Sequence, residues 1–201
     1  MKTRFNEFIN EKMSNEIVPP SIPNTMNFWH GGNLDDYNDI IAQKNGRYKY
    51  GAGLYITTCY GTAKKYAKGS RKLYLVTVEK GLDIADAFLD LEKVKEFVSM
   101  YVIGSKRKIL MDRLVKYTDD DKVVADVFNN IILNEEAIKS TNTRYLRNFF
   151  VESGIDYEIV DNPFGYREKM MVLYNMKKIV NVTQIKPTDE ITVFDLPTNY
   201  T

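Results

Sequence analysis

Apolar residues in the middle third of the chain, from Ile84 to Phe150, recur at helical spacing, and this pattern constrains the fold more than any other feature. Residues at i, i+3, i+4 and i+7 lie on one face of a helix. Three groups follow this spacing: Val94, Phe97, Val98 and Tyr101; Ile109, Leu110, Leu114 and Tyr117; and Val123, Val127, Ile131 and Ile132. We therefore expect a helical insertion over residues 84–150, with breaks at Gly104 and at residues 118–120.

The segments on both sides of this region read mainly as strands. Strand-like runs cover residues 54–58, 72–78, 156–160, 169–174, 179–185 and 191–194. Short helices are expected at residues 33–43, 62–68 and 144–153, the last ending at Gly154. Because strands lie at both ends and helices between them, we predict the α+β class rather than alternating βαβ units.

The length and composition fit one domain over residues 1–201, in which residues 1–23 form an N-terminal helix and a proline-rich linker. A formal net charge of +1 argues against a strongly electrostatic partner such as duplex DNA or an acidic membrane. No stretch approaches the roughly 20 apolar residues of a membrane span, so we expect a cytoplasmic protein. The chain has one cysteine and one histidine, so we predict no disulfide and no metal site.

The lone histidine, His30, lies in the segment Phe28-Trp29-His30-Gly31-Gly32, and a Gly51-x-Gly53-x-Tyr55 segment follows it. Such segments contain the groups that the nicotinamide end of NAD requires. A glycine beside a strand end lets a carboxamide approach the backbone N–H and C=O. An aromatic face stacks on the cationic ring, and an imidazole hydrogen-bonds ribose hydroxyls. A carboxylate stabilises the oxocarbenium-like centre that forms as nicotinamide leaves.

In order and spacing, these segments resemble the histidine–tyrosine–glutamate branch of the ADP-ribosyltransferase superfamily. This branch includes diphtheria-type toxins, the poly(ADP-ribose) polymerases and small bacterial and phage enzymes. The segments that carry the resemblance are His30-Gly31, Gly51-x-Gly53-Leu54-Tyr55-x-Thr57, Ala63-x-x-Tyr66-Ala67, residues 73–78 with Gly81, and residues 154–157 and 171–175. The helical middle has no counterpart in it. The resemblance implies a split fold of two small antiparallel sheets around an NAD cleft.

The resemblance also implies a role for each of these residues toward NAD, which is the substrate. His30 would hydrogen-bond a ribose, and the backbone of Gly31 would bind the carboxamide. Gly53 would shape the backbone passage before the strand. Tyr55 and Tyr66 would sandwich the nicotinamide ring, and Thr57 would line the pocket floor.

The catalytic glutamate of the family has no direct equivalent, because Met170 occupies its register position. Glu168 lies two residues earlier, on the same face of the expected strand. Asp161, at the end of the preceding strand, is the other candidate acid. A third alternative is that neither acid acts and the pocket binds NAD without turning it over.

The function that these features predict is mono-ADP-ribosyl transfer from NAD to a protein or nucleic-acid target, as in toxins and phage effectors. The helical insertion would contact the target, because it is the part unlike the family. The alternative from a different class is a catalytically degenerate module that binds NAD, ADP-ribose or a partner protein. RNA 2′-phosphotransfer ranks lower because in the related family it relies on a second histidine.

Overall fold

The computed structural model describes residues 22–34, 51–69, 72–161 and 168–185, which form two antiparallel sheets and α-helices. This arrangement confirms the α+β class. The expected N-terminal helix and linker lie almost wholly outside the described residues, as do the expected helix at 33–43 and strand at 191–194.

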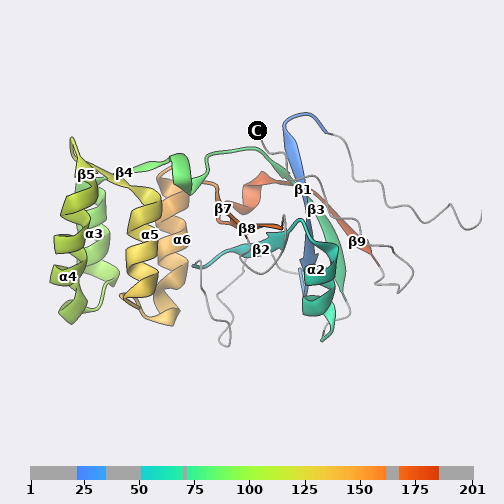
Figure 1. Ribbon diagram of the computed structural model, residues 1–201, viewed down its shortest axis with the longest axis horizontal. Helices are drawn as coiled ribbons and strands as arrows, with labels where there is room; N and C mark the ends of the chain where they lie inside the picture. Colours follow the sequence, from blue (N-terminus) through green and yellow to red (C-terminus); the bar gives the residue numbers. More distant parts are fainter. Residues whose placement is uncertain (1–21, 35–50, 70–71, 162–167, 186–201) are drawn as a thin grey trace, which may run out of the picture.

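The larger sheet contains six strands in the spatial order β7-β8-β2-β1-β3-β9. The strands are β1 (Thr25–Gly31), β2 (Leu54–Thr57), β3 (Leu73–Glu79), β7 (Tyr157–Asp161), β8 (Lys169–Leu173) and β9 (Ile179–Ile185). β1 pairs with β3 along its whole length, but the only register pair that joins it to β2 among the described residues is Trp29–Thr57. In Figure 1, β2 and β8 run at a steep angle to β1 and β3. The expected two sheets are therefore one sheet in two halves.

The helix α2 (Tyr60–Ala67) covers the β1–β3–β9 half of this sheet. Trp29, Leu73 and Leu75 share a strand face and pack against α2 in one buried cluster. The helix presents Ala63 and Ala67 to this face, and their small side chains let its backbone lie close to β1. The opposite face of the sheet carries a second buried cluster, which includes Phe28, Leu54, Ile56, Val76 and Met171.

The region from residue 84 to 152 contains four α-helices and a second sheet. Its elements are the 3-10 turn η2 (Ile84–Asp86), β4 (Phe88–Asp90), α3 (Leu91–Tyr101), α4 (Gly104–Leu114), β5 (Thr118–Asp119), β6 (Lys122–Val124), α5 (Ala125–Asn134) and α6 (Thr143–Glu152). Gly104, expected as a break between helices, is the first residue of α4. The sheet, of order β4-β6-β5, corrects the expectation of a purely helical insertion. Asp120 and Asp121 both have positive φ, at 44° and 59°, as the tight turn between β5 and β6 requires.

The insertion packs on the sheet through one continuous core. Phe97, Phe128, Phe149 and Phe150 form a chain of ring contacts inside it. The same cluster includes Val172 of β8, with Tyr55 of β2 packed against it. Tyr55 and Val172 are register partners, so they lie on one face of β2 and β8. Figure 1 shows the helices beside this half of the sheet and α2 over the other half.

The Phe128 ring should carry much of the stability of this core, because it is fully buried between three other phenylalanine rings. We expect Phe128→Ala to lower the free energy of unfolding by about 3–5 kcal/mol, the usual cost of emptying a buried phenylalanine site. Urea denaturation measures this loss. Phe88→Ala is the control, because the Phe88 side chain is 61% exposed, and its effect should stay within about 0.5 kcal/mol. Equal losses in both variants would contradict the assignment of this core.

Candidate functional site at the split between β1 and β2

The peptide groups of Gly31 face the place where the two halves of the sheet separate. Along β1, the bonds to β3 come from alternate residues: Gly32 N–H donates to Lys72 O at 3.1 Å, and Lys80 N–H donates to Asn24 O at 2.9 Å. By the alternation of an antiparallel ladder, Trp29 and Gly31 direct their N–H and C=O groups toward β2. Trp29 meets Thr57 there, but a Gly31–Tyr55 pair does not follow in the register of the described strands. Gly31 thus offers a donor and an acceptor to the split.

His30 is hydrogen-bonded across the split. Its Nδ1 lies 2.8 Å from the carbonyl oxygen of Tyr55, and a carbonyl only accepts, so Nδ1 carries the proton. Burial lowers the pKa of His30, against the opposing effect of this hydrogen bond, so the imidazole is neutral at pH 7. The other nitrogen, Nε2, is then an acceptor. It lies beside Gly32, where a Cβ atom would stand only 3.1 Å from it.

Gly31 lies directly beneath α2. A Cβ atom at this position would stand 1.8 Å from Ala63 O and 2.8 Å from Ala67 N. Both are backbone atoms of the helix, so a side chain at residue 31 cannot be accommodated by a change of rotamer. The glycine therefore allows α2 to close over the end of β1, next to the split.

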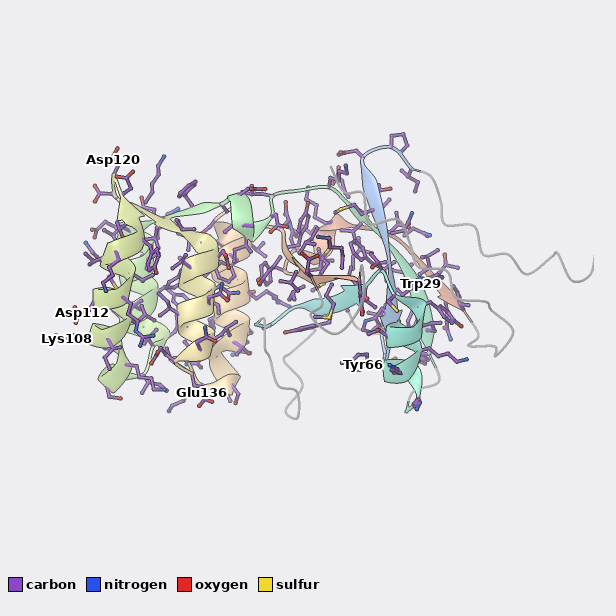
Figure 2. The ribbon with its side chains drawn as sticks, viewed as in Figure 1. Trp29, Tyr66, Lys108, Asp112, Asp120 and Glu136 are labelled. Atoms are coloured by element: carbon purple, nitrogen blue, oxygen red, sulfur yellow. The ribbon has the colours of Figure 1, made fainter. Side chains whose placement is uncertain are left out.

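The two tyrosines expected around the nicotinamide ring lie in different surroundings. Tyr55 is half-buried, and its hydroxyl donates to Gly51 O at 2.7 Å. Tyr66, on α2, is 74% exposed and lies at the end of the molecule away from Lys108 and Asp112 (Figure 2). Gly53 is needed for close packing, because a Cβ there would stand 2.8 Å from Leu173 O. The sandwich of a ring between Tyr55 and Tyr66 stays a prediction.

Glu168 lies next to Thr57, the residue that joins the two halves of the sheet. The Thr57 hydroxyl donates to Glu168 Oε1 at 2.5 Å and accepts the N–H of Cys59 at 3.1 Å. Glu168 is only 6% exposed. Thr57 is the register partner of Met170, where the family resemblance places the catalytic acid. The Glu168 carboxylate therefore reaches the side chain directly opposite that position.

Asp161 is placed differently. It lies at the end of β7, the outermost strand of this half, with β8 and β2 between it and the split. Its register partner is Lys169, and the two form an ion pair at 2.6 Å in which the Asp161 side chain is 79% exposed. Asp161 and Lys169 alternate with Val160 and Met170, so they lie on the other face of the strands. The structure thus brings Glu168, and not Asp161, next to Thr57.

A second buried acid, Glu158, is a feature that the sequence patterns did not reveal. It lies on β7 opposite Val172, which is itself opposite Tyr55, so all three share one row and one face of the sheet. Its Oε2 accepts the Tyr174 hydroxyl at 2.7 Å and Asn129 Nδ2 at 3.0 Å. Burial raises the pKa of Glu158 to about 7, with the two hydrogen bonds opposing the rise.

Asn129, on α5, connects this acid to the segment before β2. It is 1% exposed, and its Oδ1 has no hydrogen-bond partner within the described parts of the chain. A Cβ atom at Gly51, whose φ is +88°, would stand 3.6 Å from this oxygen. In the sequence, Glu158 alternates with apolar residues and reads as a solvent-facing strand position. Its burial comes from tertiary contacts, in which Asn129 of α5 and Tyr174 lie against its carboxylate.

Within the described ranges, no group of three or more His, Cys, Asp or Glu side chains is arranged to bind a metal ion. The helices of these ranges also lack the length and apolar character needed to cross a membrane. Comparisons of the chain with protein-family models, curated proteins and solved structures found no match.

The buried Glu158 should make stability depend on pH. Because its pKa is about 7 when folded and 4.5 ordinarily, the folded protein binds more protons, and stability falls as pH rises between these values. The loss is complete above pH 7 and amounts to roughly 3 kcal/mol. We expect Glu158→Gln to remove this component, so that the variant loses less stability than the wild type from pH 5 to pH 8. Urea denaturation across this range measures it; parallel curves would contradict the burial of an ionisable Glu158.

Gly31→Ala tests the contact between β1 and α2. The added methyl group must displace the helix backbone, so we expect a loss of about 3 kcal/mol or more in the free energy of unfolding. Gly69→Ala is the matched control just past the C-terminal end of α2, because a Cβ there meets nothing within 4 Å. Thermal unfolding of both variants measures the difference. A Gly31→Ala protein as stable as Gly69→Ala would show that α2 does not lie this close to β1.

Proposed function

We propose that the protein is a mono-ADP-ribosyltransferase that transfers ADP-ribose from NAD to a protein or nucleic-acid target. The observation that carries this proposal is the pair of Gly31 peptide groups directed into the split beside a neutral His30. The family resemblance assigns NAD contacts to the same two residues.

The split offers groups that complement the nicotinamide end of NAD. A primary carboxamide has one acceptor oxygen and two N–H donors, so it pairs with a backbone N–H and C=O presented side by side. Gly31 presents both. His30 Nε2 then accepts a hydrogen bond from a ribose hydroxyl, because Nδ1 is already engaged by Tyr55 O. The family resemblance assigns the rings of Tyr55 and Tyr66 to stack on the nicotinamide ring.

In the reaction, the bond between the ribose anomeric carbon and the nicotinamide nitrogen breaks. Nicotinamide leaves as a neutral molecule with the bonding electron pair, and the anomeric carbon gains oxocarbenium character. The Glu168 carboxylate, oriented by the Thr57 hydroxyl, stabilises this positive charge. A nucleophile of the target then attacks the anomeric carbon and loses its proton to solvent or to Glu168. With water as the nucleophile, the same steps hydrolyse NAD.

The second candidate function is a module that binds NAD or ADP-ribose without catalysis. Two observations favour it. Met170 occupies the register position of the family's acid, opposite Thr57. Glu168 is also already hydrogen-bonded within the protein, to the Thr57 hydroxyl. In this case the split binds the ligand and the helical insertion transmits its presence to a partner.

Nicotinamide release distinguishes the two functions. Purified protein is incubated with NAD, with and without cell lysate as a source of targets, and nicotinamide is followed by chromatography. We expect Glu168→Gln to lower the rate by about 10²–10³-fold, as when an electrostatic stabiliser is removed. Asp161→Asn is the matched control and should leave the rate unchanged, because Asp161 is exposed and distant from the split.

Two other results would change this assignment. A rate that falls with Asp161→Asn and not with Glu168→Gln would reverse the roles of the two acids. No release with lysate present, together with NAD binding measured by calorimetry, would support the binding module over the enzyme.

A further inference from the structure

A series of contacts leads from Glu158 of β7, through the helical insertion, to His30. It begins at Glu158 Oε2, which accepts Asn129 Nδ2 at 3.0 Å; Asn129 Oδ1 lies 3.6 Å from where a Cβ atom at Gly51 would stand, a van der Waals neighbour and not a hydrogen-bond partner. Gly51 O accepts the Tyr55 hydroxyl at 2.7 Å, and Tyr55 O accepts His30 Nδ1 at 2.8 Å. The series joins β7, α5, the segment before β2, and β1. None of the roles derived above for NAD uses Glu158, Asn129 or Gly51.

We propose that Glu158 is a positioning residue of the split, whose protonation state sets how Asn129 contacts Gly51 and thereby how firmly Tyr55 and His30 are placed for ligand binding. The identity of the ligand as NAD rests on the proposed function. The positioning itself does not, because every contact in it lies within the protein.

The charges around Glu158 favour its protonated form. Asp126 of α5 and Asp83, which precedes η2, both raise the pKa of Glu158 by repulsion, and burial raises it most. The Tyr174 hydroxyl and Asn129 Nδ2 are the groups that stabilise the carboxylate. A proton on Glu158 therefore relieves the repulsion from two neighbouring carboxylates at once.

Protonation also changes which atom of Asn129 faces Gly51. An ionised Glu158 only accepts, so it binds the Nδ2 group and leaves Oδ1, which lacks a partner within the described residues, toward Gly51. A protonated Glu158 carries an O–H donor that Oδ1 can accept once the amide turns over. Nδ2 then faces Gly51, whose carbonyl oxygen has a second lone pair beside the one that Tyr55 uses. The protonated form thus satisfies the buried oxygen and adds a donor next to the segment that positions Tyr55.

Amide hydrogen exchange tests this without any ligand. We compare the wild type with Glu158→Gln, whose amide resembles the neutral acid and cannot ionise, at pH 6 and at pH 8. Residues 73–79 of β3, which are covered by α2 and β9, report overall unfolding, whose free energy itself changes with the ionisation of Glu158. At pH 8 we expect residues 51–57 to exchange about fivefold faster in the wild type than in Glu158→Gln, beyond any difference seen in residues 73–79; fivefold is the lower end of usual coupling between sites. At pH 6 that excess should fall below about twofold.

Glu152→Gln is the matched control, since it removes an exposed carboxylate of α6 and should behave as the wild type. Equal exchange of residues 51–57 in wild type and Glu158→Gln at pH 8 overturns the proposal. A difference that extends equally to residues 73–79 also overturns it, because it reports overall stability and not positioning.

NAD affinity, measured by calorimetry on the same proteins, separates this proposal from the proposed function. If exchange differs as expected and NAD binds, wild-type affinity should fall about fivefold from pH 6 to pH 8 while that of Glu158→Gln stays constant. Parallel affinities in the two proteins would overturn the link to ligand binding. If exchange differs and neither protein binds NAD, the positioning role of Glu158 stands and the NAD assignment fails.

Discussion

The two halves of the main sheet depend on a single register pair, Trp29–Thr57, within the described strands. A pair of strands that continued to Gly31–Tyr55 would close the sheet and use the peptide groups of Gly31. The His30 ring donates to the Tyr55 carbonyl, which is the acceptor that Gly31 N–H would meet in such a pair. One side chain thus bridges the two halves of the sheet at the point where the ladder ends. The same residue contributes the nitrogen that a sugar hydroxyl can use.

The position of the split also follows from what covers the sheet. On one face, α2 covers β1 and β3, and the helical insertion covers β2 and β8. The boundary between the two covered parts lies where β1 and β2 separate. Polar groups can persist there because neither apolar cluster extends across the junction. The buried row of Tyr55, Val172 and Glu158 lies under the insertion, and the proposed positioning role of Glu158 would couple the insertion to Tyr55 through this row and through Asn129.

The spacing of apolar residues in the sequence was enough to predict several of the helices and strands. The helix expected at residues 144–153 is α6 (Thr143–Glu152), and the strand expected at residues 72–78 is β3 (Leu73–Glu79), since both bury a regular apolar face. The hairpin of β5 and β6 was not predicted, because its strands are too short for alternation to show. In α4, Leu110 and Leu114 are buried while Ile109 is 49% exposed, so the apolar spacing predicted a wider buried face than this helix has.

Residues of the candidate site could be predicted from the sequence only where the nearby backbone requires a particular residue type. Gly31 and Gly53 lie where a neighbouring backbone leaves no room for a Cβ atom, and His30 lies where a strand ends and a carbonyl needs a donor. Nothing in the residues next to Glu168 and Asp161 indicates which of the two acids lies near the split. The choice depends on a hydrogen bond between residues 111 positions apart in the chain, Thr57 and Glu168. Glu158 was missed for the related reason that strand alternation places a residue on a face and does not say what packs on that face.

The combination of Met170 and Glu168 gives the acid a particular geometry. A glutamate at residue 170 would extend from the strand directly opposite Thr57. At residue 168 the carboxylate starts before β8 and returns to the same row by accepting the Thr57 hydroxyl. Thr57 in turn accepts the Cys59 N–H at the start of α2, the helix that also covers Gly31. Thr57, which binds Glu168, therefore contacts the residue that precedes α2, and Gly31 lies against the same helix, so α2 borders both the candidate acid and the backbone groups of Gly31.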